Sequence, residues 1–280
     1  GPSSRTKHIT LLPMEQTLDI RYINLALGYV LLLIPVTIFH YFRTGLVRDS
    51  LIAVLRMTIQ LTLVGLYLEV LFEYNNAWIN SLWWIIMVII AAFTITRRAY
   101  LTRRFFVIPL AISLLISLAI VDAYFLGIVI DLDYFFDARY FIPISGIILG
   151  NCLKTNILGL NTFYKTIHQE KVRYRYYLAN GATQAEALAP FMREALRTAF
   201  NPLIATITVV GLISLPGMMT GQILGGSSTQ VAIKYQIMLM ISLFASTLIS
   251  VVLTIIIANR LVFDDYGNMK ENVMKKNQNI

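Results

Sequence analysis

The chain has 280 residues, of which 57% are hydrophobic and 14% are charged, and its formal net charge is +8. A soluble globular domain typically carries about 25% charged residues, so this composition excludes a protein whose surface faces water on all sides. The length suits one membrane domain with short loops, and we expect no soluble catalytic domain beside it. The Lys and Arg residues collect in loops between apolar blocks, which is typical of membrane topology rather than of nucleic-acid binding.

Seven apolar blocks are each long enough to cross a lipid bilayer, which takes about 20 mainly apolar residues. In chain order they cover residues 22–42, 51–72, 77–95, 106–130, 140–160, 200–224 and 232–258. The blocks are continuously apolar and too long for barrel strands, so we expect helices. The predicted fold class is therefore all-α, a polytopic membrane protein with about seven transmembrane helices.

The charges in the loops indicate how these helices are oriented. Basic residues follow the first, third, fifth and seventh blocks. Acidic residues collect in the loops after the second and fourth blocks, at Glu73, Asp131, Asp133 and Asp137. By the positive-inside rule, the N-terminus is expected outside the cell and the C-terminus in the cytoplasm.

The same pattern divides the chain into three parts. We expect residues 1–21 to be an extracytoplasmic tail, and its first four residues, G-P-S-S, are typical of a tag-cleavage scar. Residues 22–260 form the predicted transmembrane domain, which includes a cytoplasmic segment at 161–199. Residues 261–280 form the predicted cytoplasmic C-terminal tail.

The cytoplasmic segment is the one long hydrophilic stretch of the sequence, and it contains clear helix signals. Thr183 is followed three residues later by Glu186, the spacing of a capping box, in which each side chain bonds the other residue's backbone amide. Gly181, just before them, suits a tight turn. Pro190 interrupts a helix, so we predict a short helix that ends just before it. Such a helix would fit a groove on another protein, although an ordinary capped connection explains the same residues.

The sixth block is rich in glycine at four-residue spacing, which places small residues on one helix face and lets two helices approach closely. A proline within it frees a backbone carbonyl, and in lipid such a break should face protein or a water-filled cavity. This favours a helix that moves as the protein works, although plain helix packing explains the same pattern. The residues singled out for translocation or packing are Gly146, Gly150, Pro216, Gly217, Gly221, Gln222 and Gly225.

Few side chains in the sequence suggest chemistry. Met218 and Met219 suit a soft metal, but a methionine pair in an apolar helix also packs well. Glu69 and Asp122 lie toward the outer ends of their helices, where they would form an acidic vestibule for cation release or simply stand where basic residues are excluded. These four are the weak metal candidates. The run at 146–155 lacks the P-loop glycine before its lysine, so we expect neither an enzyme active site nor a cofactor in this chain.

The sixth block also carries a family resemblance. Residues 210–224 read V-G-L-I-S-L-P-G-M-M-T-G-Q-I-L, which strongly resembles the hallmark of the FetB-type ABC permeases, a family of bacterial iron-export permeases and plant aluminium-tolerance proteins. Three further stretches are similar to that family, at 142–151, 181–187 and 232–237. The resemblance covers most of the chain after Arg43.

The resemblance implies a permease subunit of an exporter in the inner membrane of a bacterial cell, with iron or another metal ion as substrate. It implies a separate ABC ATP-binding subunit that holds ATP and Mg, and two copies of each chain. The residues it assigns to coupling with that ATPase are Gly181, Ala182, Thr183, Glu186 and Ala187. Plant relatives are linked to nucleotide sugars, so an organic solute stays open as the substrate.

Two functions outside this family also stay open. A secondary transporter would need no ATPase, and its two halves would show an inverted repeat. A seven-helix receptor with an extracellular N-terminus is disfavoured by the glycine-rich sixth block and by the capped cytoplasmic segment.

Overall fold

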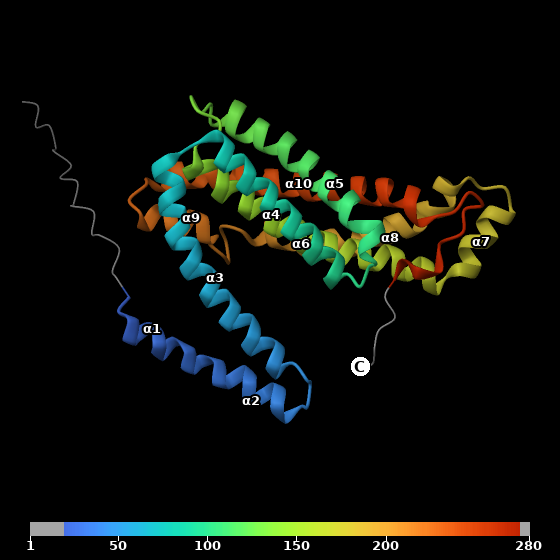
Figure 1. The fold of residues 1–280 in the computed structure, drawn as a ribbon, viewed down its shortest axis with the longest axis horizontal. Helices are drawn as coiled ribbons and strands as arrows, with labels where there is room; N and C mark the ends of the chain where they lie inside the picture. The colour runs from blue at the N-terminus through green and yellow to red at the C-terminus, as the bar shows by residue number, and fades with distance from the viewer. Residues whose placement is uncertain (1–19, 275–280) are drawn as a thin grey trace, which may run out of the picture. The chain divides into compact units, whose positions relative to one another are not determined.

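The computed structural model describes residues 20–274, and nearly all of them are helical (Figure 1). In chain order the elements are α1 (Tyr22–Gly28), the 3₁₀ helix η1 (Tyr29–Leu32), α2 (Leu33–Tyr41), α3 (Val47–Tyr74), α4 (Ala77–Arg98), α5 (Arg103–Asp122), the π-helix η2 (Ala123–Val129), α6 (Ala138–Gln169), α7 (Lys171–Ala179), α8 (Gln184–Val209), α9 (Gly217–Leu224), α10 (Thr229–Val262) and the 3₁₀ helix η3 (Glu271–Val273). No named strand forms between residues 20 and 274. The all-α prediction is confirmed, and the predicted scar at 1–4 lies outside the described residues.

Six helical segments in the described part of the chain are long and apolar enough to cross a membrane. They are Tyr22–Tyr41, Val47–Tyr74, Ala77–Arg98, Arg103–Val129, Ala138–Gln169 and Thr229–Val262. Each contains one of the predicted blocks almost completely, so six of the seven predicted spans are confirmed by length and composition. The chain is a polytopic α-helical membrane protein.

The sixth predicted span, over 200–224 with a break at Pro216, is not among the helices of spanning length. α8 ends at Val209, residues 210–216 are not helical, and α9 begins at Gly217. The cause is local. Gly211 has a φ of +85°, a left-handed conformation that glycine adopts without steric cost. Pro216 has no backbone N–H to donate within a helix. Together they widen the break predicted at Pro216 to seven residues.

The short helix that was predicted to end before Pro190 is also wrong, because α8 continues through Pro190 and Pro202 to Val209. Its buried residues are Ala187, Leu188, Phe191, Ala195, Ala199, Phe200 and Leu203. They recur every three or four residues on both sides of Pro190, which is the spacing of one helical stripe. A proline inside a helix costs about 3 kcal/mol. Burial of this continuous stripe offsets that cost, since each fully buried large apolar side chain contributes about 1.5–3 kcal/mol.

The chain divides into two compact units. The first comprises the described residues up to Val70 together with Gly217–Ile233. In it, α2 and α3 form a hairpin (Figure 1), and the Tyr29 hydroxyl lies 2.6 Å from Thr58 Oγ1. The most apolar stretches of Tyr22–Tyr41 and Val47–Tyr74 contain no buried residue. So much exposed apolar surface is stable only when lipid or another chain covers it.

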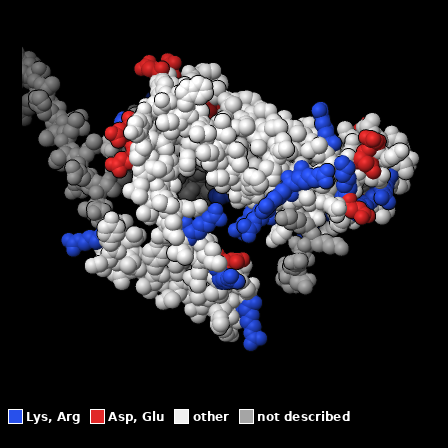
Figure 2. All heavy atoms as spheres, in the orientation of Figure 1, with Lys and Arg blue, Asp and Glu red and all other residues white. Residues whose placement is uncertain are grey.

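The second unit comprises Leu71–Pro216 and the described residues from Lys234 onward, and it holds the core. There α4 packs on α5 and α6, and α6 packs on α8. In the space-filling view, charged atoms gather toward the ends of the helices, while the surface over α4 and α5 carries few of them (Figure 2). This distribution suits helices whose sides face lipid and whose ends face water.

A row of hydroxyl side chains runs along the buried face of α10, and we call it the hydroxyl seam. Its members are Ser242, Ser246, Ser250 and Thr254, all of them buried. Two of them contact α6: Cys152 Sγ lies 3.4 Å from Ser246 Oγ, and the Asn156 amide donates to Ser250 Oγ at 2.8 Å. Lipid tails are as apolar as leucine, so polar contacts of this kind help to hold membrane helices together.

Gly159 marks a very close helix contact in this core. A Cβ atom built there would lie 3.2 Å from Val251 Cγ1 on α10 and 3.3 Å from Ala199 Cβ on α8. Only a glycine lets α6 approach both neighbours this closely. By contrast, a Cβ atom at Gly150, a predicted packing residue on the same helix, would meet nothing within 4 Å. The glycine that packs within the chain was therefore missed, because it has no glycine partner four residues away.

Candidate functional site

The turn that joins α7 to α8, residues 180–186, is called the capped turn below. Gly181 has a φ of +86°, and the Ala182 N–H donates to the Tyr177 carbonyl at 3.1 Å, which closes the end of α7. The Glu186 N–H donates to Thr183 Oγ1 at 3.3 Å, and the Thr183 N–H donates to Glu186 Oε2 at 2.8 Å. The predicted turn and capping box are both confirmed.

The capped turn projects from the surface of the chain. Gly181, Thr183 and Glu186 are exposed, Ala182 is half-buried, and Ala187 is fully buried. Hydrogen bonds from the Thr183 N–H and hydroxyl lower the pKa of Glu186, so this carboxylate is charged at neutral pH. Its charge complements the positive N-terminal end of α8. The capped turn therefore presents a negatively charged helix start at the surface, and Ala187 anchors it in the interior.

Three aromatic side chains, from α7, from α8 and from the residue just after α10, pack together near the capped turn. Tyr174 on α7 is 3% exposed, and its hydroxyl donates to the Gly267 carbonyl at 2.8 Å. Its ring centroid lies 6.3 Å from that of Phe191 on α8 and 5.8 Å from that of Phe263, just after α10. Since these rings pack together, α7, α8 and the end of α10 form one body at this end of the second unit.

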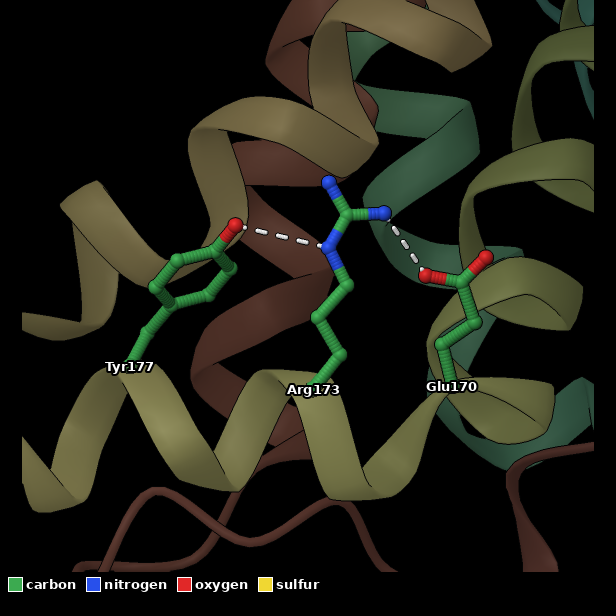
Figure 3. Close-up of polar contacts among 3 residues, drawn as sticks. All are labelled: Glu170, Arg173 and Tyr177. Carbon is green, nitrogen blue, oxygen red and sulfur yellow. Dashed lines mark hydrogen bonds and ion pairs between the residues drawn. The ribbon is translucent and has the colours of Figure 1, made fainter.

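Arg173 reinforces the same region from the exposed side of α7 (Figure 3). It donates from Nη1 to Glu170 Oε2 at 2.8 Å and from Nε to the Tyr177 hydroxyl at 3.4 Å. Its guanidinium carbon also lies 5.7 Å from the ring centroid of Phe191. Exposed ion pairs contribute little to stability. The bonds to Glu170 and Tyr177 lie within α7 and its N-cap and fix the arginine side chain, and its contact with Phe191 is the one that reaches α8.

The chain after α10 was predicted only as a tail, but its described part makes specific contacts. The Thr102 N–H donates to the Val273 carbonyl at 3.0 Å, and Val273 is 1% exposed. Lys270 Nζ donates to the Leu261 carbonyl at 2.8 Å and lies 5.6 Å from the ring centroid of Phe105. This segment therefore joins the α4–α5 loop to the α7 region. The signal in the sequence was weak: a few apolar side chains, among them Met269 and Val273, are scattered among polar ones.

The break between α8 and α9 is a compact turn with exposed apolar side chains. The Gly211 N–H donates to the Ser214 carbonyl at 2.9 Å, and the Ile213 N–H donates to the Val209 carbonyl at 3.0 Å. Leu212 is 87% exposed and Ile213 is 81% exposed. Non-helical backbone at membrane depth is tolerated only where protein or a water-filled cavity lies beside it. The break therefore needs a cover that this chain does not supply from the second unit.

The other glycines that were predicted to pack have free space beside them in the described structure, or a contact only with their own helix or with one side chain. A Cβ atom at Gly217 or Gly221 would meet nothing within 4 Å, and one at Gly225 would meet its own helix, 3.1 Å from the Gly221 carbonyl oxygen. At Gly146 the nearest atom is the Met87 methyl carbon, 3.4 Å away. The chain's own helices therefore leave these faces largely unused.

The acidic metal candidates, Glu69 and Asp122, do not belong to a cluster of metal-ligating side chains in the described part of the chain. Among residues 20–274, no group of three or more His, Cys, Asp or Glu side chains could hold a metal ion. Glu69 is exposed, whereas Asp122 is 1% exposed. The expectation that Asp122 lines an open acidic vestibule is therefore wrong, because the helices around it bury the side chain.

Asp122 is instead an intramembrane acid at a change of helix type. It ends α5, where the helix widens into the π-helix η2, a geometry common at functional sites. The Ser145 hydroxyl donates to Asp122 Oδ2 at 2.7 Å, and Oδ1 has no partner within the described chain. Acids at membrane depth are costly and are functional candidates for that reason.

On α9, Met218 and Gln222 are four residues apart and therefore share one helix face. The Gln222 Oε1 atom is buried and has no hydrogen-bond partner in the part of the chain that the structure describes. Met218 and Met219 are each half-buried. An unpaired buried amide oxygen beside a thioether can accept a hydrogen bond or a metal contact from a bound molecule.

Comparison with known proteins identifies relatives along almost the whole chain. The family model described as "Uncharacterised protein family (UPF0014)" matches residues 22–263. The chain is 28% identical over 252 residues to the UPF0014 membrane protein YjkA of Bacillus subtilis, covering 90% of this chain and 99% of that one. It is 28% identical over 256 residues to the "Probable iron export permease protein FetB" of Escherichia coli, covering 90% and 96%. It is 31% identical over 216 residues to the protein ALUMINUM SENSITIVE 3 of Arabidopsis thaliana, covering 77% of each chain. No solved structure matches the chain.

Proposed function

Because the chain belongs to the UPF0014 family of membrane proteins, we propose that it is the permease subunit of an ABC exporter driven by a separate ATPase subunit. The family resemblance predicted from residues 210–224 is confirmed by the family match, and one relative is named as a probable iron export permease. The observation that carries the proposal is the capped turn, which stands exposed at the start of a long, well-anchored helix.

α8 supports a mechanical role for the capped turn. The helix has 26 residues, so it is about 39 Å long at 1.5 Å per residue. Its first residue, Gln184, directly follows the N-cap Thr183, and its last residue precedes the break at 210–216. Because α8 is continuous through Pro190, a push on the capped turn would move one rigid rod whose far end adjoins the break. ATP and Mg, bound by the partner subunit, would supply that push.

Helix contacts would carry the movement of α8 into the rest of the second unit. Ala199 on α8 and Val251 on α10 lie on either side of Gly159 on α6. Two helices that meet at one glycine cannot shift far without displacing the helix between them. The aromatic rings around Tyr174 add a second link, between α7, α8 and the end of α10.

The exposed apolar surface supports an assembly of two permease chains and two ATPase subunits. In the first unit, the hairpin of α2 and α3 has no buried residue in its most apolar stretches. The faces of Gly146 and Gly150 on α6 are open or nearly so, which suits close contact with another helix. A bacterial inner membrane would provide the surrounding lipid.

We propose iron or another metal ion as the substrate, on the strength of the relative named as an iron export permease. Met218 and Gln222 on α9 are the candidate contacts in one unit, and Asp122 is the candidate in the other. An organic anion such as a nucleotide sugar is the alternative substrate.

The test is flux and ATP hydrolysis by the complex of this chain with its ATPase, purified and reconstituted in liposomes. Ferrous iron, manganese and a nucleotide sugar are supplied in separate arms. We expect a metal to stimulate hydrolysis and to cross the membrane only when ATP is present. Stimulation by the nucleotide sugar alone would reassign the substrate. Flux at the full rate without the ATPase subunit would refute the proposed function.

One observation favours a secondary transporter as the second candidate. Broken helices such as α8 and α9 often form the substrate sites of ATP-independent transporters. In that case the chain alone, in liposomes with an ion gradient, would move solute, and ATP would have no effect.

A further inference from the structure

A hollow of about 890 Å³ lies at the tip of the α2–α3 hairpin, inside the first unit. Its lining residues are Phe39, His40, Arg43, Gly45, Val47, Arg48, Leu51 and Ile52. The chain reverses direction here with Arg43 at φ +49° and Gly45 at φ +72°. Figure 2 shows basic atoms at this end of the hairpin. The turn therefore brings two arginines, five positions apart, to the rim of one hollow.

The walls of this hollow are of two chemical kinds. Phe39, Val47, Leu51 and Ile52 supply apolar surface, whereas Arg43, Arg48 and His40 supply hydrogen-bond donors. In the described part of the chain, neither arginine side chain forms an ion pair or a hydrogen bond. Asp49, next to Arg48, is exposed and makes no ion pair with either. Two free guanidinium groups above an apolar wall match a molecule with an anionic head and an apolar body.

The position of the hollow in the membrane identifies that molecule further. Both Tyr22–Tyr41 and Val47–Tyr74 are candidate spans, so the loop between them lies where the chain leaves the bilayer. Arginines at this level reach the headgroup region while their stems stay in apolar surroundings. Guanidinium groups bind phosphate oxygens in pairs, and basic pockets at helix ends bind anionic lipid headgroups.

The size of the hollow separates a lipid from a free anion. A volume of about 890 Å³ is at the upper end of the range typical of small-molecule sites, which is about 300–1,000 Å³. A phosphate ion alone would leave Phe39, Leu51 and Ile52 uncovered. The glycerol group and the upper acyl chains of a phospholipid would cover them.

We propose that the hollow at the α2–α3 turn is a binding site for an anionic phospholipid, with Arg43 and Arg48 on the phosphate and with Phe39, Leu51 and Ile52 against the acyl chains. The bound lipid would fix the tip of a hairpin that has little packing of its own. This site is independent of the proposed transport activity.

The test compares lipid binding by variants of the full chain, purified in detergent and titrated with phosphatidylglycerol or phosphatidylcholine under native mass spectrometry. The variant Arg43→Gln/Arg48→Gln removes both guanidinium groups. The variant Arg97→Gln/Arg98→Gln at the end of α4 removes the same charge elsewhere and serves as the control. We expect the first variant to lose about 30-fold in phosphatidylglycerol affinity, since each basic side chain near an anionic surface contributes about a fivefold factor. Phosphatidylcholine binding should be unchanged.

Further measurements separate a lipid site from a soluble-anion site and from a general effect of charge. Inorganic phosphate and glycerol phosphate, at millimolar concentration, should not displace phosphatidylglycerol, and equal competition would reassign the hollow to a soluble anion. Equal losses in the two double variants would show a general charge effect and overturn the site. If the glutamine variant does not fold, Arg43→Lys/Arg48→Lys keeps the charge but loses paired hydrogen bonds. We then expect a partial loss with this variant, and unchanged affinity would overturn the site.

Discussion

Gly159 allows a direct test of how the core is packed. In a Gly159→Val variant the new side chain would enter a space already closed by Val251 at 3.2 Å and Ala199 at 3.3 Å. Overpacking of this kind costs about 1–3 kcal/mol, and the better helix propensity of valine returns roughly 0.5 kcal/mol. We expect a net destabilisation of roughly 0.5–2.5 kcal/mol. The matched change Gly150→Val meets no atom within 4 Å at its Cβ and should leave stability unchanged or slightly raised.

The chain carries its own reporter for this experiment. Cys152 is its single cysteine, it is buried, and it faces the hydroxyl seam on α10. A maleimide dye becomes fluorescent on this thiol only after α6 and α10 separate, so heating with the dye reports the opening of that interface. Gly159→Val should open at a lower temperature than the wild type, and Gly150→Val should not. Equal transition temperatures for both valine variants would refute the packing at Gly159.

The other predictions concern the capped turn and the buried acid. Gly181→Ala places a side chain at φ +86°, which costs about 1–2 kcal/mol, and it should lower ATP-dependent transport by the reconstituted complex while membrane insertion stays normal. Thr183→Ala removes the helix cap and should destabilise the first turn of α8 by about 1 kcal/mol, measured by amide hydrogen exchange. The capping bonds lower the pKa of Glu186, so the stability they give is present above the ordinary glutamate pKa and is lost as the pH falls through the lowered value. The protection factors of the same amides, which are corrected for the intrinsic exchange rate at each pH, should therefore fall on acidification, and Glu186→Gln should abolish that dependence. Ser145→Ala leaves Asp122 without its hydroxyl partner and should cost about 1–3 kcal/mol of stability, which the dye assay would record as a lower transition temperature. Equal transition temperatures for this variant and the wild type would show that the bond from Ser145 does not stabilise the buried acid.

The fold was largely predictable because a chain that crosses a lipid bilayer needs long apolar segments, and these are easy to recognise in a sequence. Six apolar blocks became helices of spanning length, since a chain in a bilayer must satisfy its backbone internally. The helix predictions that failed both concern segments that contain a proline. A proline inside α8 was expected to end the helix, but a buried stripe on both sides outweighed one lost hydrogen bond. Near Pro216 no such stripe exists, because Leu212 and Ile213 are exposed, and the helix does break.

The candidate site was predictable only where its signals are local in sequence. The capping box depends on residues three apart, and it was identified correctly. Asp122 was noticed, but its burial was not predicted, because it lies against α6, where its hydrogen-bond donor Ser145 is 23 residues further along the chain. The contacts of the C-terminal segment join Thr102 to Asn272 and Val273, about 170 positions away, and no short motif records them. The coupling residues, the partners and the substrate stay predictions.

The hydroxyl seam repeats the same chemistry along the axis of α10. Its members recur every four residues, and four residues rise about 6 Å, close to one helical turn. A slip of α10 by that step would replace each hydroxyl facing Cys152 or Asn156 with the next one, so these two groups would keep an equivalent partner, whereas the Tyr164 hydroxyl would lose Asn259. An interface of interlocking leucines would have to come apart to make the same movement. Cys152 and Asn156 would therefore find a hydroxyl partner in more than one register of α10, and the bond from Tyr164 to Asn259 favours the register that is observed.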